Sequence, residues 1–398
     1  MSGPCSYDRP RRIRSGAALT LLLAGVIALG AVTGAWHDEA EGAVESVAAQ
    51  RPAEGPAADR AAVERAAAKA VEDGKSGSQA AAEVVSRSGD RWSTIYTHGE
   101  FEDFQEQLDG AYVGVGLWVR QQAGGRIAVS RVQPGSPAAR AGIAVGDGLD
   151  AIDGRASRGR PVTETVARLR GDDHGGSRGA AAGTPVRLDL ERAARHWSVT
   201  LHRARLRTQN VTVDRPAGAG GPTRIRVAAF ARGTGAAVRR AVAAADPRHG
   251  LLLDLRGNTG GLVTEAVATA SVFLDGGLVA TYDVRGSQRA LYAKRAGNTR
   301  IPLVVLVDGG TMSAAELLSG ALQDRGRAVV VGSPTFGKGS VQMPSELADG
   351  SVAELTVGHY RTPSGHTVDG AGITPDLIVE DHAENRARTV LSGLGTGA

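Results

Sequence analysis

The strongest constraint on this chain is a series of short, wholly apolar runs that alternate with helical patterns in its carboxyl-terminal half. The runs "RIRVAAF", "GLLLDLRGN", "IPLVVLVDGG" and "RAVVVGSP" are predicted strands, and helices are predicted over 233–245, 262–273 and 313–325. Strands that are apolar on both sides belong to a sheet that is covered on both faces. The pattern therefore predicts an α/β core with functional side chains at its strand ends.

A different pattern covers residues 112–205. Period-two runs at 126–132 and 186–190 predict half-exposed strands, and two short helices fit at 136–141 and 162–169. The region has about a hundred residues, a common domain size. It is predicted to form a separate strand-rich domain.

The first 36 residues contain an uncharged stretch of 22, residues 15–36, preceded by four arginines. As a helix it extends about 33 Å, enough to cross a hydrocarbon layer of ~30 Å. Arginines before it and "HDEAE" after it predict a cytoplasmic N-terminus and an exported remainder. A cleaved signal peptide is the alternative, because small residues at "AVTGA" can be cut. A linker is expected at 37–58 and a helical region at 59–111.

Composition excludes several classes of site. The chain has 46 basic and 42 acidic residues, and the basic ones are dispersed, which argues against a nucleic-acid partner. Cys5 is the only cysteine, so no disulfide framework, thiolate metal site or cysteine nucleophile is expected in the body of the chain. No GxxxxGK[ST] motif occurs, which excludes a P-loop.

Ser313 opens a predicted helix with an apolar stripe, directly after a predicted strand. With Glu316 three positions on it matches a capping box, worth about 1 kcal/mol. The same position offers helix N–H groups and a positive dipole end to an anionic tetrahedral intermediate. The motif alone favours the cap and leaves both roles open.

Lys338 lies 25 positions later, in "TFGKGSVQ". Action as a base near neutral pH requires its pKa to fall about three units from a reference value of about 10.4, which burial without an acidic partner can cause. No Asp or Glu occurs between Asp324 and Glu346, and nearby residues are apolar. The turn "DLRGNTGG" is a third candidate element, suited to an oxyanion hole, a phosphate-binding turn or a plain loop.

Together these segments resemble the carboxyl-terminal processing peptidases of serine protease family S41, over about 90–381. The closest agreement is in "TMSAAE", "ALQDRGRAVVVGSPTFGKGSVQ" and "DLRGNTGG". The resemblance implies a crotonase/ClpP-like α/β protease core at 206–382, followed by a C-terminal tail at 383–398. It implies no metal and no organic cofactor.

The resemblance also implies roles for particular residues. Ser313 would be the nucleophile, Lys338 the general base and Gln342 the polar residue that orients the lysine. The oxyanion hole would consist of the backbone amides of Ala314 and of Gly260 or Gly261.

The segments "GVGLWV", "VQPGSPAARAGIAVGDGLDAIDG" and "GTPVRLDLER" resemble a bacterial PDZ domain, inserted at 112–205. Such domains bind extended peptides by strand addition and capture the terminal carboxylate with backbone N–H groups of a Gly-rich loop. By this resemblance the loop consists of Gly114, Val115, Gly116 and Leu117.

The expected function is a serine endopeptidase that cleaves exported or membrane-associated proteins near their C-termini through an acyl-enzyme. Its partners would be polypeptides with exposed C-terminal tails and, through the N-terminal helix, the cell membrane, with the catalytic part on the extracytoplasmic side or secreted. The oligomeric state stays open. The alternative function is a proteolytically inactive PDZ scaffold at the membrane, which predicts loss of Ser313 or Lys338. A tricorn-like Ser–His pair with His98 is a third, weaker hypothesis.

Overall fold

The computed structural model describes residues 57–171, 180–215, 220–284 and 287–395 of the 398-residue chain. The expected membrane segment at 15–36 and nearly all of the linker lie outside these residues. Within the described ranges, no helix has the length and apolar character needed to cross a membrane.

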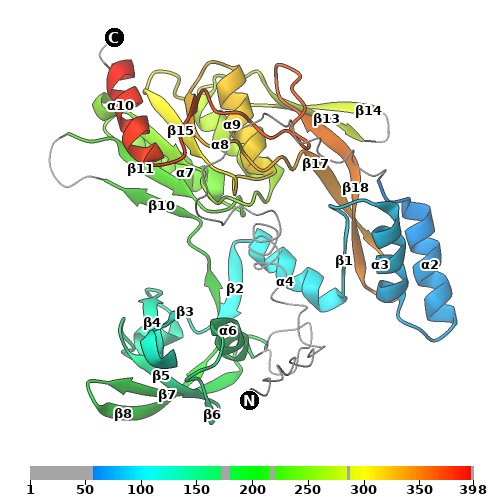
Figure 1. Cartoon of the computed structure of the whole chain (residues 1–398), viewed down its shortest axis with the longest axis vertical. Coiled ribbons are helices and arrows are strands. Elements are labelled where there is room, and N and C mark those ends of the chain that lie inside the picture. Colours follow the sequence, from blue (N-terminus) through cyan, green and yellow to red (C-terminus); the bar gives the residue numbers. More distant parts are fainter. Residues whose placement is uncertain (1–56, 172–179, 216–219, 285–286, 396–398) are drawn as a thin grey trace, which may run out of the picture. The chain divides into compact units, whose positions relative to one another are not determined.

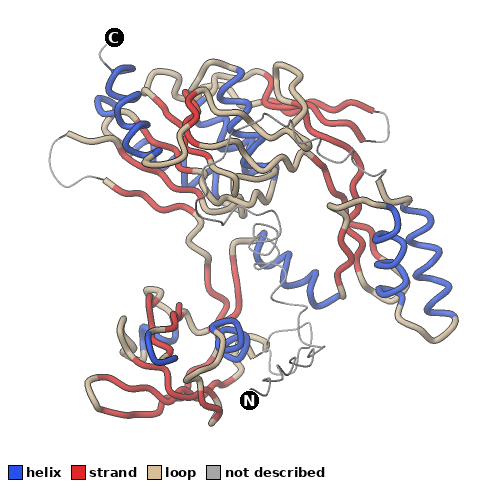
Figure 2. The backbone as a smooth tube through the Cα atoms, in the orientation of Figure 1, coloured by secondary structure: helices blue, strands red, loops and turns tan. Residues whose placement is uncertain are grey.

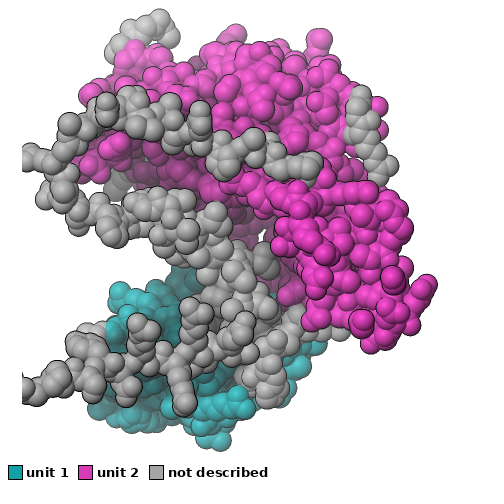
Figure 3. All heavy atoms as spheres, turned by 45° about the vertical axis from the view of Figure 1, so that its right-hand side comes forward, with its two compact units in different colours: residues 1–45, 113–204 teal, residues 46–112, 205–398 magenta. Residues whose placement is uncertain are grey.

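The chain divides into two compact units, shown in two colours in Figure 3. The smaller unit holds the described residues from 113 to 204. The larger unit holds those before 113 and those after 204. It is therefore assembled from two stretches that flank the smaller unit in the sequence.

A six-stranded sheet forms the centre of the larger unit (Figure 1). Its order is β10 (Val211–Asp214), β11 (Thr223–Val227), β12 (Leu251–Asp254), β15 (Leu303–Val307), β16 (Val329–Gly332) and β19 (Leu377–Ile378). All neighbours are parallel except β10, which is antiparallel to β11. Every residue of β15 is buried, as expected for a strand with both faces covered.

Helices cover both faces of this sheet. The helices are α7 (Thr234–Ala243), α8 (Val263–Phe273), α9 (Ala314–Asp324) and α10 (Ala383–Gly395), with a 3₁₀ turn η2 (Pro247–His249). Leu251 and Leu253 pack in one core with α7, α8 and α9, whereas Leu252 packs in another with α10. The α/β fold class is thus confirmed.

The last helix differs from the expectation of a C-terminal tail at 383–398. Residues 383–395 form α10, and its Ala387 and Leu391 are buried against the sheet. Ala383, Ala387, Val390 and Leu391 recur at helical spacing, so the apolar stripe is present but short.

A second sheet extends the larger unit (Figure 2). It contains β1 (Thr94–Tyr96), β18 (Val352–Arg361), β13 (Leu278–Val284) and β14 (Ser287–Tyr292), and β17 (Ser340–Glu346) also pairs with β18. The N-terminal helices are α2 (Arg60–Glu72), α3 (Gly77–Ser88) and α4 (His98–Leu108). Residues of α2 and α3 share an apolar cluster with Ala353 and Leu355 of β18. The β1–β18 pairing brings residues near 90 beside residues near 355.

The smaller unit is a strand-rich domain. Its sheet has the order β3 (Leu117–Gln121), β4 (Ile127–Val132), β5 (Gly148–Ile152), β7 (Pro185–Arg192) and β8 (Arg195–His202), with β6 (Arg155–Ala156) on β5. Its helical segments are η1 (Ala123–Gly125), α5 (Pro137–Arg140) and α6 (Val162–Arg170). The chain enters and leaves through β2 (Ala111–Gly114) and β9 (Ala204–Arg207), which pair with each other.

The docking of α10 can be tested by shortening one buried side chain. Leu391 is 3% exposed, and we expect Leu391→Ala to lower the free energy of unfolding by about 2–4 kcal/mol. Leu394→Ala is the matched control, since Leu394 is 43% exposed and its change should stay within about 0.5 kcal/mol. Equal effects of the two substitutions in urea unfolding would show that α10 is not docked.

Candidate active site

Ser313 lies in a sharp strand-to-helix turn. Strand β15 ends at Val307 and α9 begins at Ala314, and Ser313 has φ 55° and ψ −119°. A residue with a side chain rarely adopts this backbone conformation, which is typical of nucleophile turns and functional sites. Its hydroxyl makes no capping hydrogen bond. Ser313 is nevertheless the N-cap residue of α9, and the Glu316 carboxylate holds its N–H, so its role at the start of the helix is confirmed.

Glu316 holds this turn in place. Its Oε2 accepts the Ser313 N–H at 2.8 Å and the Lys338 N–H at 2.9 Å. Its Oε1 accepts the Thr335 hydroxyl at 2.5 Å and the Gly337 N–H at 2.7 Å. One buried carboxyl group thus joins the serine turn to the lysine loop.

The sequence showed Glu316 only as half of a capping box. The Glu316 carboxylate accepts the Ser313 N–H, as in a capping box, and the Glu316 N–H donates to the Ser313 carbonyl at 2.8 Å. Glu316 is 0% exposed. Burial raises the pKa of its carboxyl, and the hydrogen bonds from Thr335, Gly337, Ser313 and Lys338 offset part of that rise. No local sequence pattern indicates that Glu316 contacts residues 335–338.

The Lys338 side chain lies against aromatic rings. Its Nζ is 5.3 Å from the centre of the Trp92 ring, and that ring meets Phe336 edge-on at 5.7 Å between centroids. Burial lowers the pKa of the Lys338 amine. A lowered pKa is the property that a lysine base requires.

The expectation of acid-free surroundings for Lys338 was wrong. Four carboxyl groups raise the pKa of its amine electrostatically, in decreasing order Glu354, Asp369, Asp90 and Glu316, although the effect of burial is larger. None belongs to the stretch between Asp324 and Glu346. The fold brings them from distant segments, which local sequence inspection cannot reveal.

The structure brings the backbones of Ser313 and Lys338 to one carboxylate, but it does not join their reactive groups. In the part of the chain that is described, no hydrogen bond links the Ser313 hydroxyl to the Lys338 amine. The roles of nucleophile and base therefore stay predictions.

The turn after β12 packs against Ser313. A side chain at Gly260 would place its Cβ 2.9 Å from the Ser313 Cβ and 3.2 Å from the Ala314 nitrogen, and Gly260 has φ +96°. Glycine is therefore required there. Asn258 orders this turn, because its Oδ1 accepts the Gly260 N–H at 2.9 Å and its carbonyl accepts the Met312 N–H at 2.8 Å.

This hydrogen bond corrects one of the oxyanion-hole candidates. The Gly260 N–H is used by Asn258, so it is not available to a substrate oxygen. The N–H groups of Gly261 and Ala314 have no acceptor among the described residues. They stay the predicted donors.

Gln342 does not orient Lys338 in this structure. It lies on β17, next to a register shift, and its Nε2 donates to the Ser340 hydroxyl at 2.7 Å. No hydrogen bond to Lys338 is present among the described side chains. A bulge re-aims the side chains of a strand in a way that residue spacing does not show.

In the smaller unit, the predicted carboxylate-binding loop runs from Gly114 at the end of β2 to Leu117 at the start of β3. Gly116 has φ +81°, and a Cβ there would lie 2.2 Å from the Cβ of Ser136. The Val115 carbonyl accepts the Ala138 N–H at 3.0 Å, which fixes the loop to α5. Capture of a peptide carboxylate by this loop stays a prediction.

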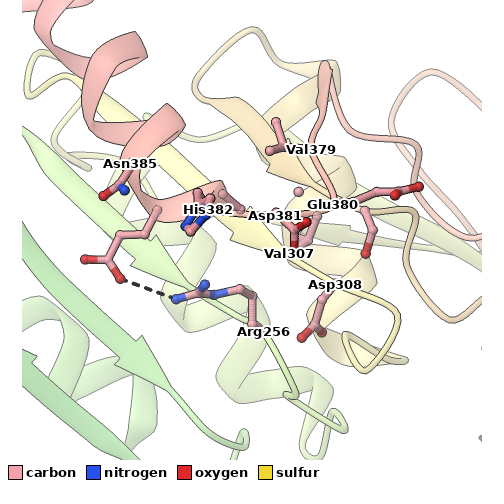
Figure 4. A pocket seen from close by; sticks show the side chains of 12 residues that line it. Arg256, Val307, Asp308, Val379, Glu380, Asp381, His382 and Asn385 are labelled. Atoms are coloured by element: carbon pink, nitrogen blue, oxygen red, sulfur yellow. Dashed lines mark ion pairs between the residues drawn. The ribbon is translucent and has the colours of Figure 1, made fainter. Parts of the chain in front are cut away.

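A cavity of about 540 Å³ lies elsewhere in the larger unit, where β15 and β16 end and α10 begins (Figure 4). Neither Ser313 nor Lys338 lines it. Arg256, from "DLRGN", binds Asp254 through Nε at 2.8 Å and Nη2 at 2.7 Å and lies 3.6 Å from Glu384 of α10. Burial raises the pKa of Asp254, but hydrogen bonds from Arg256 and its charge outweigh this, so the pKa is lowered. This arginine helps to hold α10.

The histidines lie apart from Ser313 in their contacts. His98 forms an ion pair with Glu102 of its own helix at 3.3 Å. His359 lies 2.9 Å from Asp369, whose other oxygen accepts the Gly339 N–H at 3.0 Å. The Ser–His hypothesis gains no support from these contacts.

Two family models match parts of the chain. The model of peptidase family S41 matches residues 223–379, and a PDZ-domain model matches residues 128–175. The chain is 30% identical over 301 residues to the carboxy-terminal processing protease CtpA of Bacillus subtilis, covering 75% of this chain and 62% of that protein. It is 31% identical over 288 residues to the carboxy-terminal-processing protease of Bartonella bacilliformis, covering 70% and 64%.

Among solved structures, the photosystem II D1 C-terminal processing protease matches with 27% identity and a TM-score of 0.46, covering 81% of this chain and 86% of that one. The chain spans less than two thirds of the length of the two curated relatives.

The bridge made by Glu316 predicts the effect of one isosteric change. Glu316→Gln replaces an acceptor oxygen with an NH₂ group that faces N–H donors, and we expect it to lower the free energy of unfolding by about 1–3 kcal/mol. Glu346→Gln, on the exposed surface of β17, is the control and should change it by less than about 0.5 kcal/mol. Urea unfolding measures both, and an unchanged stability of Glu316→Gln would contradict the bridge.

Proposed function

We propose that the chain is a serine endopeptidase that cleaves polypeptides near their C-termini, because residues 223–379 match the model of peptidase family S41 and residues 128–175 match a PDZ-domain model. One observation carries the proposal. A single carboxylate receives the backbone N–H groups of both Ser313 and Lys338, and Ser313 has the backbone conformation of a nucleophile turn.

In the proposed mechanism, the Ser313 hydroxyl attacks the scissile carbonyl and the neutral Lys338 amine takes its proton. The N–H groups of Ala314 and Gly261 stabilise the negative oxygen of the tetrahedral intermediate. The amine then gives the proton to the leaving nitrogen, which leaves an acyl-enzyme on Ser313. Water hydrolyses this ester with Lys338 again as base.

The lysine must move for this reaction. Its amine lies over the Trp92 ring, so rotation about the side-chain bonds has to bring it to the Ser313 hydroxyl. The bridge by Glu316 supports the proposal, since it keeps the two backbones together while the side chain moves.

We assign substrate recognition to the PDZ domain. Strand β3 is at the edge of its sheet, which leaves one side open to an added peptide strand. The loop 114–117 precedes this strand and would receive the terminal carboxylate. Proteins with exposed C-terminal tails are the proposed substrates.

We further propose that the chain works outside the cytoplasm, held at the membrane by residues 15–36 or released after cleavage there. The support is the uncharged stretch of 22 residues between arginines and an acidic segment.

The dyad is tested by two substitutions on an unfolded protein with an apolar C-terminal tail. We expect Ser313→Ala and Lys338→Ala each to reduce the cleavage rate by at least about 10³-fold, because nucleophile and base act as one unit. Lys294→Ala, in a loop before β15, serves as the control and should keep the wild-type rate. Full cleavage by either dyad variant would refute the mechanism, and an inactive wild type would favour the scaffold.

The lowered pKa of Lys338 predicts the pH dependence. Only the neutral amine accepts a proton, so the rate should rise with pH through the pKa of Lys338. Because burial lowers that pKa, the midpoint should lie below the reference value of about 10.4. Single-turnover rates measured across the pH range test this. A midpoint at or above the reference value would contradict a buried base.

A further inference from the structure

Trp92 contacts the proposed base although it lies far outside residues 223–379. Its ring centre is 5.3 Å from the Lys338 Nζ and 5.7 Å from the Phe336 ring centre. The Arg91 guanidinium carbon lies 4.5 Å from the same ring. The tryptophan is therefore one wall of the place where the amine rests.

The fold fixes Trp92 firmly. The Asp90 Oδ1 accepts the N–H groups of Trp92 at 3.0 Å and Ser93 at 3.1 Å, and also the Thr356 hydroxyl at 3.1 Å. The Ser93 hydroxyl accepts the Thr356 N–H at 2.9 Å. Through these bonds the turn that carries Trp92 is tied to β18.

Hydrogen bonds favour the ionised form of the anchoring carboxyl group. Burial raises the pKa of Asp90, but hydrogen bonds from Ser93, Trp92 and Ala58 outweigh that effect, so the pKa is lowered. The anchor therefore depends on the ionised form of Asp90.

The indole nitrogen does not explain the presence of tryptophan at this position. Trp92 Nε1 is buried and has no hydrogen-bond partner among the described residues. An unpaired buried N–H is unfavourable. The contribution of the side chain must come from the face and volume of its ring.

We propose that Trp92 is a positioning residue for Lys338, whose ring holds the amine in its resting place and stabilises its protonated form. The inference rests on the proposed role of Lys338 as base. A cation is attracted to the electron-rich face of an indole ring, most strongly where water is excluded.

Other charges act on the same amine and must be considered with the ring. Carboxyl groups face it from β18 (Glu354), from the loop after β18 (Asp369), from the turn before β1 (Asp90) and from α9 (Glu316). All four have further partners: those of Asp90 and Glu316 are described above, Tyr96 hydrogen-bonds Glu354, and His359 pairs with Asp369. A positive charge is also present, because the Arg91 guanidinium lies over the ring of Trp92. A substitution of Trp92 leaves all of these charged residues in the chain.

The chain has only four lysines, Lys69, Lys75, Lys294 and Lys338, so their amines can be titrated individually. The test labels the full chain with [ε-¹³C]lysine, assigns Lys338 by Lys338→Arg, and compares wild type with Trp92→Leu and Trp92→Phe. Leucine keeps apolar volume but has no π face. We expect Trp92→Leu to lower the pKa of Lys338 by about 0.4–0.7 unit and Trp92→Phe by about half as much.

Trp118→Leu is the matched control. Trp118 lies in the smaller unit with Arg131 3.6 Å from its ring centre, so its loss removes a tryptophan–cation contact in the unit that does not contain Lys338. In Trp118→Leu, the pKa of Lys338 should equal that in the wild type. Circular dichroism establishes that each variant is folded.

An unchanged or raised pKa of Lys338 in folded Trp92→Leu would overturn the inference. If Trp92→Leu does not fold, Trp92→Phe tests the inference instead. An unchanged pKa of Lys338 in Trp92→Phe would then overturn it. The midpoint of the rate–pH curve should move with the titration of the amine. A shifted titration with an unmoved rate curve would leave the role of Trp92 intact and refute Lys338 as the base.

Discussion

A buried carboxylate with four donors is the interaction on which the candidate site depends. Ser313 has a backbone conformation that costs free energy, and such strain persists only where the surroundings impose it. Glu316 imposes it by accepting the Ser313 N–H, and the same oxygen accepts the Lys338 N–H. The serine turn and the lysine loop are therefore fixed relative to each other by one side chain.

The surroundings of the lysine come from segments that are remote in sequence. Trp92 and Asp90 precede β1, Glu354 belongs to β18, and Glu316 belongs to α9. Burial and nearby carboxylates act on the amine in opposite directions, so its proton affinity depends on the exact placement of each segment. The N-terminal residues are thus part of the site chemistry rather than an appendage to it.

How much could be predicted from the sequence differs between the fold and the site. The helices expected at 262–273 and 313–325 correspond to α8 and α9 within one residue, because long apolar stripes at helical spacing are strong local signals. The Gly260 N–H, the Gln342 side chain and the Lys338 amine each have surroundings that local sequence does not indicate. Each depends on a partner outside its own segment, namely Asn258, the bulge in β17 and the carboxyl groups near Lys338.

The pairing of β1 with β18 also sets the order of events during synthesis. Residues 94–96 emerge from the ribosome long before residues 352–354, the partners with which they pair. At about 5–20 residues per second, the interval of roughly 250 residues lasts on the order of 10–50 s. The turn that carries Trp92 lacks its β18 partner for that time. A nascent chain that ends between residues 339 and 352 therefore holds Ser313 and Lys338 without the strand that anchors Trp92 beside the lysine.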